Sequence, residues 1–284
     1  MWSNMTSFVK RHPLPTFIAL AYLFSWWPAL LYLFRPMPVA VASFGPFLAA
    51  LVVLSLTTGK TGVKDLLRQM IRWRVGWPWY LVALGLPALL AGIAVVLNVA
   101  MGAPAPSAAQ LAAWPSILPT FLLVLLVPGL GGAWEEPGWR GYATNQLERG
   151  HSKLWALAPL WLIIVVWHLP LFLTGDIERA DVFNMIGGVI IYNWLYHQSG
   201  RSVLLVMIIH AANNAVSGEY FSPMFTGAYS AQMAWLRTLM WGVAALIVLV
   251  AYWRWWTEST AQTVVDTGNL AEAPASHTSP PVPH

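Results

Sequence analysis

The sequence predicts an all-α membrane protein with about eight transmembrane helices and both termini in the cytoplasm. The first supporting observation is composition: 58% of the 284 residues are hydrophobic and only 9% are charged, whereas soluble domains carry roughly 25% charged residues. The second is the length of the apolar stretches, since no charged residue occurs between Arg74 and Glu135. The third is the presence of 18 tryptophans, because tryptophan is enriched where membrane helices meet water.

Eight apolar stretches approach the length of about 20 residues that a bilayer-spanning helix requires. They cover residues 14–34, 38–58, 79–101, 116–134, 153–174, 182–198, 201–218 and 233–254. The sixth and seventh are short and are separated by Gly200-Arg201, which predicts a tight helical hairpin. We therefore expect one polytopic membrane domain over residues 1–257. Residues 258–284 are rich in Ala, Ser, Thr and Pro and are predicted to form a disordered tail.

The distribution of Lys and Arg predicts the orientation of these helices. With eight spans both termini share one side, and that side carries Lys10, Arg11, Lys60, Lys64, Arg68, Arg72, Arg74, Arg140, Arg149, Lys153, Arg201 and Arg254. The other side carries Arg35, Arg179 and Arg237, together with the acidic loop 176–181. Because basic loops are retained in the cytoplasm, the termini are predicted to be cytoplasmic. The basic segment 61–74 is expected either to lie along the cytoplasmic membrane surface or to form a solvated loop.

Two adjacent carboxylates end the long uncharged stretch, in the sequence Glu135-Glu136-Pro137-Gly138-Trp139-Arg140. Pro137 cannot continue a straight helix, which indicates a broken backbone at this point. Glu136 and Arg140 are four residues apart and can pair on one helical face, while Glu135 points elsewhere. The alternative interpretation is a helix cap with an ion pair at the membrane surface.

Two histidines and an asparagine occur inside later apolar stretches. His168 lies in an otherwise apolar segment, and His210 and Asn214 are four residues apart on one helical face. Asn213 points about 100° away and is the weaker candidate, and His197 at a helix end is given no role. The alternative for each is a hydrogen bond that packs one helix on another.

Together these groups contain the parts of a site that activates water for hydrolysis. A glutamate can act as general base, imidazoles can share that role or bind a divalent metal, and Asn or His donors can stabilise an oxyanion. The chain has no cysteine, and it contains no His-Glu-x-x-His motif. A transporter stays open as an alternative because ionisable residues also mark ion paths, although the repeated halves typical of transporters are absent from the sequence.

The three motifs resemble those of the CAAX prenyl protease and bacteriocin-processing family of intramembrane metalloproteases. The family pattern is Glu-Glu-x-x-x-Arg, then Phe-x-x-x-His, then His-x-x-x-Asn. The first and third patterns are complete here, in residues 135–140 and 210–214, whereas Ile164 stands where the second has phenylalanine, four residues before His168. The resemblance covers residues 115–218.

The resemblance implies an intramembrane endopeptidase with a cavity that faces the cytoplasm. It implies that Glu135 activates water with help from His168, that His210 and Asn214 hold the oxyanion or a metal, and that Glu136 and Arg140 order the site. A divalent metal, with zinc as the candidate, would be held by Glu135, His168, His210 and Asn214. The expected partners are a membrane-associated peptide or protein substrate and the lipid bilayer of a bacterial plasma membrane, with no nucleic acid. The alternative is a non-proteolytic bacteriocin-immunity or scaffold protein of the same family.

Overall fold

The protein is a bundle of helices. The structure is a computed structural model that describes residues 2–32, 34 and 39–259, and in these ranges it contains helices and one isolated bridge, between Ser152 and Ser259, but no β-strand. The α-helices are α1 Trp2–Arg11, α2 Pro13–Tyr32, α3 Gly45–Thr57, α4 Gly59–Met70, α5 Trp77–Ala100, α6 Ala108–Ala112, α7 Ile117–Leu126, α8 Glu136–Gly138, α9 Asn145–Leu147, α10 Lys153–Trp167, α11 Leu169–Thr174, α12 Arg179–Gln198, α13 Val203–Asn213, α14 Ala228–Ala251 and α15 Trp253–Thr257. The all-α prediction is confirmed for the described residues.

Short 3-10 and π-helical segments connect several of these helices. They are η1 Trp114–Ser116, η2 Ala133–Glu135, η3 Trp139–Thr144, η4 Asn214–Phe221 and η5 Ser222–Met224. The predicted hairpin is present, since α12 and α13 are joined by a turn in which Gly200 and Arg201 both have positive φ angles, of 67° and 63°. The predicted disordered tail lies outside the described residues from residue 260 onward, and so does Arg35.

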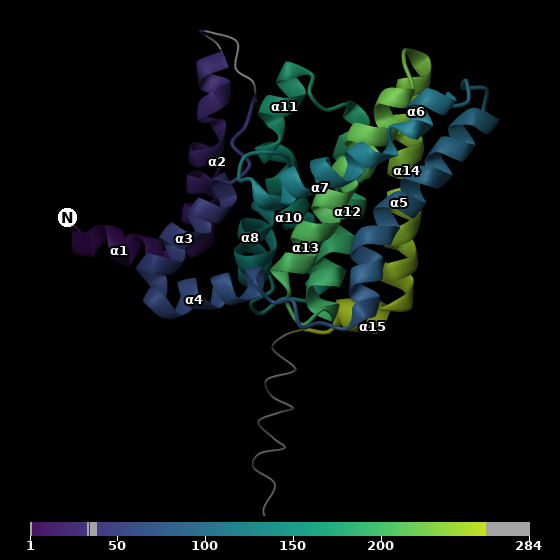
Figure 1. Ribbon diagram of the computed structural model, residues 1–284. Helices are drawn as coiled ribbons and strands as arrows, with labels where there is room; N and C mark the ends of the chain where they lie inside the picture. Colours follow the sequence, from purple (N-terminus) through teal and green to yellow (C-terminus); the bar gives the residue numbers. More distant parts are fainter. Residues whose placement is uncertain (1, 33, 35–38, 260–284) are drawn as a thin grey trace, which may run out of the picture.

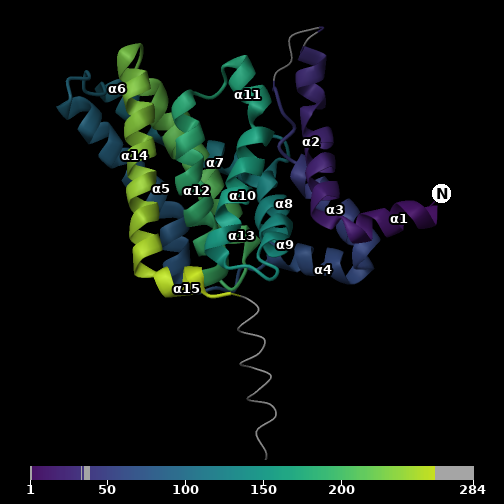
Figure 2. The ribbon, with the colours of Figure 1, turned by 180° about the vertical axis from the view of Figure 1, so that it is seen from behind.

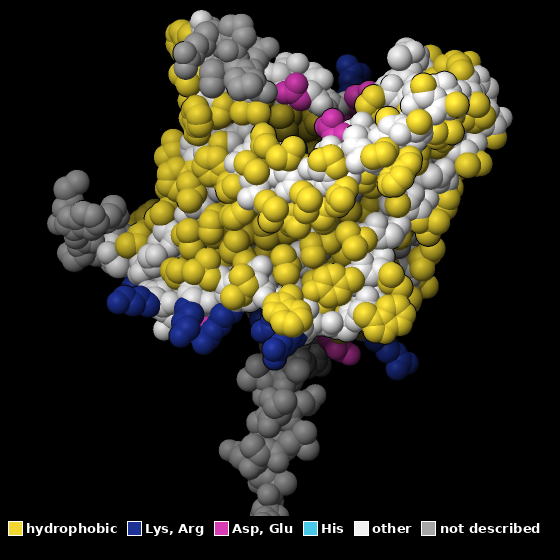
Figure 3. All heavy atoms as spheres, viewed as in Figure 1, with side chains coloured by type: hydrophobic (Ala, Val, Ile, Leu, Met, Phe, Trp, Pro, Cys, Tyr) yellow, Lys and Arg dark blue, Asp and Glu magenta, His cyan; other side chains and the backbone are white. Residues whose placement is uncertain are grey.

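Several helices are suited to a lipid environment. Within the described residues, four stretches are long and apolar enough to cross a membrane, namely Pro13–Leu31, Trp77–Ala100, Ala108–Leu126 and Ala228–Ala251. Large apolar side chains are exposed along α5 and α14, including Leu81, Val96, Leu246 and Val250, and Figure 3 shows how widely such side chains cover the surface. A surface of this kind is stable in contact with lipid tails rather than water. The chain is therefore an integral membrane protein, and the number of eight spans stays a prediction.

One end of the bundle is strongly basic. In Figures 1 and 2, α4 and α15 lie at this end. The Tyr196 hydroxyl donates to Gln69 and the Ser202 hydroxyl donates to the carbonyl oxygen of Arg72, so the turn between α12 and α13 lies there too. We call this end the basic face and define it by Lys60, Lys64, Arg68, Arg72, Arg74, Arg149, Lys153, Arg201 and Arg254.

The helix α4 forms much of the basic face. Its polar side is exposed, while Leu66 is buried against Gly141 of η3. Residues 61–70 of the segment 61–74 are therefore helical rather than a solvated loop, and the position of the segment along the cytoplasmic membrane surface stays a prediction. A helix of this kind, basic on one side and apolar on the other, is suited to the headgroup region of a membrane.

The opposite end of the bundle is acidic. It is formed by α6, the loop between α11 and α12, η5 and the start of α14 (Figure 1). The side-chain amide of Gln110 donates to the carbonyl oxygen of Met224, and Arg237 pairs with Asp181 at 2.7 Å. We call this end the acidic face and define it by Asp176, Glu178, Asp181 and Glu219. Figure 3 shows most of the visible Lys and Arg side chains at one end, and acidic side chains beside a hollow at the other end, where a basic side chain is also visible.

The short helix α8, which carries the paired glutamates, is packed on all sides. Gly138 lies against the backbone of Pro46 in α3, so closely that a Cβ atom would overlap the Pro46 carbonyl group. The next residue, Trp139, packs edge-on against Phe17 of α2 and Trp167 of α10. Tight packing of this kind fixes where the neighbouring carboxylates point.

A methyl group added at Gly138 tests this packing. We expect Gly138→Ala to destabilise the protein by about 1–3 kcal/mol, because the added Cβ forces α3 away from α8. The measurement is thermal unfolding of the purified protein in detergent. The matched control is Gly242→Ala in α14, where a Cβ atom would meet nothing within 4 Å. Equal unfolding temperatures for the two variants would contradict the close α3–α8 contact.

Candidate active site

The backbone is irregular where it reaches the two glutamates. After α7 ends at Leu126, the chain turns through Gly129 and Gly131, whose φ angles are 92° and 66°. It then forms the 3-10 segment η2, the single turn α8 that contains Pro137, and the π-helical segment η3. The break predicted from Pro137 is therefore present. Irregular backbone at membrane depth is tolerated where protein or a water-filled cavity covers it, and π-helical segments are frequent at functional sites.

Glu136 is held by partners from two directions. Its Oε2 accepts a hydrogen bond from Arg140 Nη1 at 2.7 Å, and its Oε1 lies 2.6 Å from His210 Nδ1. The side chains of Glu136 and Arg140 are only 1% and 3% exposed. The pair predicted from the i, i+4 spacing is therefore present, but it is buried rather than on the surface. The Arg140 guanidinium also lies 5.1 Å from the ring centre of Tyr192.

Glu135 points in a different direction, as the sequence predicts. Its Oε2 accepts a hydrogen bond from Trp139 Nε1 at 3.2 Å, and the residue is 4% exposed. Its Oε1 lies beside Gly132, and so does Nε2 of His210, so the carboxylate and the imidazole face the same small space. A side chain at position 132 would fill that space, which explains why glycine occupies it.

His168 comes from the C-terminal end of α10. Its Nδ1 lies 2.8 Å from the carbonyl oxygen of Ile164, and its ring contacts Trp167 edge-on. Nδ1 is therefore the donor to this carbonyl, which leaves Nε2 available to another group. Because a backbone carbonyl orients the ring, the departure from the family pattern at Ile164 does not remove the hydrogen bond that positions His168.

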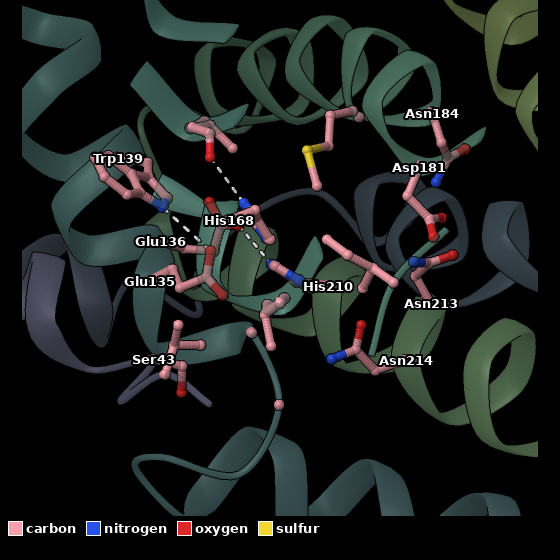
Figure 4. Close-up of a pocket in the computed structure, with 18 of the residues that line it drawn as sticks. Ser43, Glu135, Glu136, Trp139, His168, Asp181, Asn184, His210, Asn213 and Asn214 are labelled. Atoms are coloured by element: carbon pink, nitrogen blue, oxygen red, sulfur yellow. Dashed lines mark hydrogen bonds and ion pairs between the residues drawn. The ribbon is translucent and has the colours of Figure 1, made fainter. Parts of the chain in front are cut away.

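All six predicted site residues line one cavity of about 440 Å³. Glu135, Glu136 and Arg140 come from the segment η2–α8–η3, His168 from the α10–α11 junction, and His210 and Asn214 from α13 and η4. Figure 4 shows the carboxylates and both imidazoles close together, with Asn213 and Asn214 farther along the cavity on the side of His210. The sequence thus predicted correctly that these distant segments meet.

The cavity also contains residues to which the sequence analysis gave no role. Asn213, judged the weaker candidate, lines the cavity, and its buried Oδ1 has no hydrogen-bond partner. Ser43, which precedes α3, is 5% exposed and its hydroxyl also has no partner. Tyr192, Asp181 and Asn184 of α12 complete the polar lining. The run 181–192 offered no charge pattern or motif that could have identified them.

His197, which was given no role, lies outside the cavity and has a largely buried side chain. Its Nε2 is 2.8 Å from Glu148 Oε1, and the two side chains are 9% and 6% exposed. This pair joins the end of α12 to the end of α9 near the basic face. Its partner Glu148 precedes α10 by only a few residues, and no local spacing links it to His197.

The donor set of the cavity suits a divalent metal in its chemistry, since it combines carboxylate and imidazole ligands. However, among the residues that the structure describes, no three His, Cys, Asp or Glu side chains are grouped as they would be to hold a metal ion. Glu136 is already committed to Arg140 and to His210 Nδ1. Metal binding therefore stays a prediction.

The fold and the cavity define the class of protein: a polytopic helical membrane protein with a buried site of carboxylates and imidazoles. Residues 113–216 match the family model described as type II CAAX prenyl endopeptidase Rce1-like. The resemblance inferred from the three motifs is therefore confirmed, and these residues form an Rce1-like segment that contains every predicted site residue.

A curated relative supports the same family. The chain is 23% identical over 180 residues to CAAX prenyl protease 2 of Methanococcus maripaludis, a match that covers 58% of this chain and 65% of that protein. The chain thus matches less than two thirds of the length of its relative.

The buried pair of Glu136 and Arg140 gives a testable consequence for stability. We expect Glu136→Ala and Arg140→Ala each to destabilise the protein by roughly 3–5 kcal/mol, because each leaves the other charge buried and unpaired. The double variant should lose less than the sum of the two losses, since it leaves neither charge behind. Denaturant unfolding of all three variants in detergent measures this.

The exposed pair of Asp65 and Arg68 in α4 is the matched control, with side chains 56% and 60% exposed. Alanine variants of that pair should unfold almost as the parent protein does, because water replaces the lost partner. Additive losses at Glu136 and Arg140 would show that the two charges do not depend on each other.

Proposed function

We propose that this protein is an intramembrane endopeptidase that hydrolyses a peptide bond in a membrane-associated peptide or protein. The observation that carries the proposal is the position of Glu135, a buried carboxylate with one oxygen held by Trp139 and the other facing the cavity beside His210. A carboxylate in this situation can accept a proton from water in the cavity.

In the proposed reaction, Glu135 is the general base. It removes a proton from a water molecule as the water oxygen attacks the carbonyl carbon of the scissile bond, and it then returns that proton to the departing amine nitrogen. His168 offers Nε2 toward the cavity because Nδ1 is held by the Ile164 carbonyl, so it can position the same water. Both groups lie on fixed backbone, which reduces the entropic cost of aligning water and substrate.

The remaining site residues support the negative charge that develops on the carbonyl oxygen. His210 Nδ1 lies 2.6 Å from Glu136 Oε1, and a proton on Nδ1 makes this contact a hydrogen bond that leaves Nε2 directed at the cavity. Protonated His210 and the Asn214 amide are then donors for the oxyanion. Glu136 and Arg140 act on His210 rather than on the substrate, and we assign them a positioning role.

A second candidate is a non-proteolytic member of the family, such as a bacteriocin-immunity or scaffold protein. One end of the cavity is polar and contains Asn213, Asn184 and Asp181. These side chains can bind a peptide backbone whether or not the peptide is then cleaved. A proton-coupled transporter is the third candidate. Cleavage of a peptide bond separates the first from the other two.

Replacement of Glu135 by glutamine tests the catalytic proposal. We expect Glu135→Gln to lower the rate of cleavage of a membrane peptide library by roughly 100-fold to 10,000-fold, because the amide cannot accept the proton. The measurement is mass spectrometry of products in proteoliposomes. The control is Glu258→Gln at the exposed end of α15, which should cleave as the parent protein does. Full activity in Glu135→Gln would refute the assignment of the base.

Metal binding is a separate proposal with its own measurement. If Glu135, His168, His210 and Asn214 hold a divalent ion such as zinc, purified protein should contain about one equivalent of metal, and His210→Ala should lose it. Elemental analysis by mass spectrometry measures this directly. Metal-free protein that retains full cleavage activity would contradict the metal proposal and leave the role of Glu135 intact.

A further inference from the structure

The catalytic cavity opens toward the acidic face. Its lining includes Asp176, Ile177 and Asp181, which belong to the loop between α11 and α12 and to the first turn of α12. A second hollow at the acidic face shares those three residues, together with Asn184, Asn213 and Asn214, and continues to Glu219 and Arg237. None of the residues that define the basic face lines either hollow. A path from the site to water therefore exists at the acidic face.

The side of the membrane that each face occupies follows from the basic residues. Nine Lys and Arg residues define the basic face, whereas the described residues of the acidic face include only Arg179 and Arg237. Arg237 is paired with Asp181, and its side chain is only 14% exposed. Arg140, which the sequence analysis counted on the cytoplasmic side, is buried in the site and belongs to neither face. The asymmetry persists without it, and Lys and Arg rather than Asp and Glu set orientation.

We propose that the site receives its substrate from the non-cytoplasmic face of the membrane. The basic face lies in the cytoplasm, and the cavity opens at the other end of the bundle. Two expectations from the sequence therefore exclude each other: termini and basic loops in the cytoplasm, and a cavity that faces the cytoplasm. The geometry of the described residues keeps the first and replaces the second.

This orientation narrows the substrate class and, in that respect, rests on the proposed peptidase function. A peptide bond reaches Glu135 from the acidic face only if its segment enters from the outer side, as an external juxtamembrane segment or a peptide arriving from outside. A prenylated tail on a cytoplasmic protein would have to pass the basic face, where neither hollow opens. The geometry thus favours outer-face peptides over cytoplasmic lipidated tails.

The absence of native cysteine makes the orientation directly measurable. Single-cysteine variants are made at the mouth, Ile177→Cys, inside the cavity, Asn213→Cys, and on the basic face, Thr61→Cys, an exposed position in α4. A small, charged, membrane-impermeant thiol reagent is applied to spheroplasts that produce each variant, and then to inverted vesicles from the same cells. For each variant, the rate of labelling in spheroplasts is divided by the rate of labelling in inverted vesicles.

We expect Ile177→Cys and Asn213→Cys to react at least tenfold faster in spheroplasts, and Thr61→Cys at least tenfold faster in inverted vesicles. The reverse pattern, or equal rates in both preparations, overturns the proposal. If Ile177→Cys does not fold, Glu178→Cys at the adjacent exposed position replaces it. The labelling needs no catalysis, so a reversed pattern refutes only the orientation, whereas full activity in Glu135→Gln refutes only the assigned base.

Discussion

The charge of Glu136 has to be compensated inside a helical bundle from which water is largely excluded. An isolated buried carboxylate costs several kcal/mol even after relaxation of its surroundings. Here Arg140 satisfies one oxygen from the next turn of the same segment, and His210 satisfies the other from α13. Because each of the three groups would be costly without the others, this network fixes α13 against the broken segment that carries Glu135. The catalytic proposal depends on that fixed relation.

The network also explains why the backbone around it is irregular. Two adjacent glutamates on a regular helix point about 100° apart, and both still have to reach partners in the interior. The turn at Gly129 and Gly131, the 3-10 segment η2 and the π-helical segment η3 bring the chain into the bundle at α8. Glycine at 132 leaves the space in which Glu135 and His210 meet, and glycine at 138 lets α3 approach. The residues around the glutamates are therefore constrained by the space available to their side chains as well as by charge.

Local spacing predicted part of this site. The i, i+4 distance predicted that Glu136 and Arg140 pair and that His210 and Asn214 share a face, and both pairs line the cavity. Local spacing could not predict the contact between His210 and Glu136, which are 74 residues apart. It also missed Asn213, because the change from α-helix to π-helix after Asn213 alters the angle between neighbouring side chains. No local sequence pattern indicates that His197 and Glu148 form a buried pair. The same is true of the burial of Ser43.

The residues that form the site and the residues that determine the orientation of the bundle in the membrane lie in different parts of the chain. This difference matters when the substrate of a protein is inferred from its family. The Rce1-like segment, residues 113–216, carries the site residues, and their arrangement would be the same whichever way the bundle lay in the membrane. Six of the nine residues that define the basic face lie outside that segment, and five of these six are in α4 or in the short stretch that follows it. A family match can therefore preserve the chemistry of a site while the side from which substrate arrives depends on residues outside the match. For this protein, the basic residues of α4 bear on the side of the membrane from which substrate is proposed to arrive, whereas the glutamates bear on the reaction that is proposed.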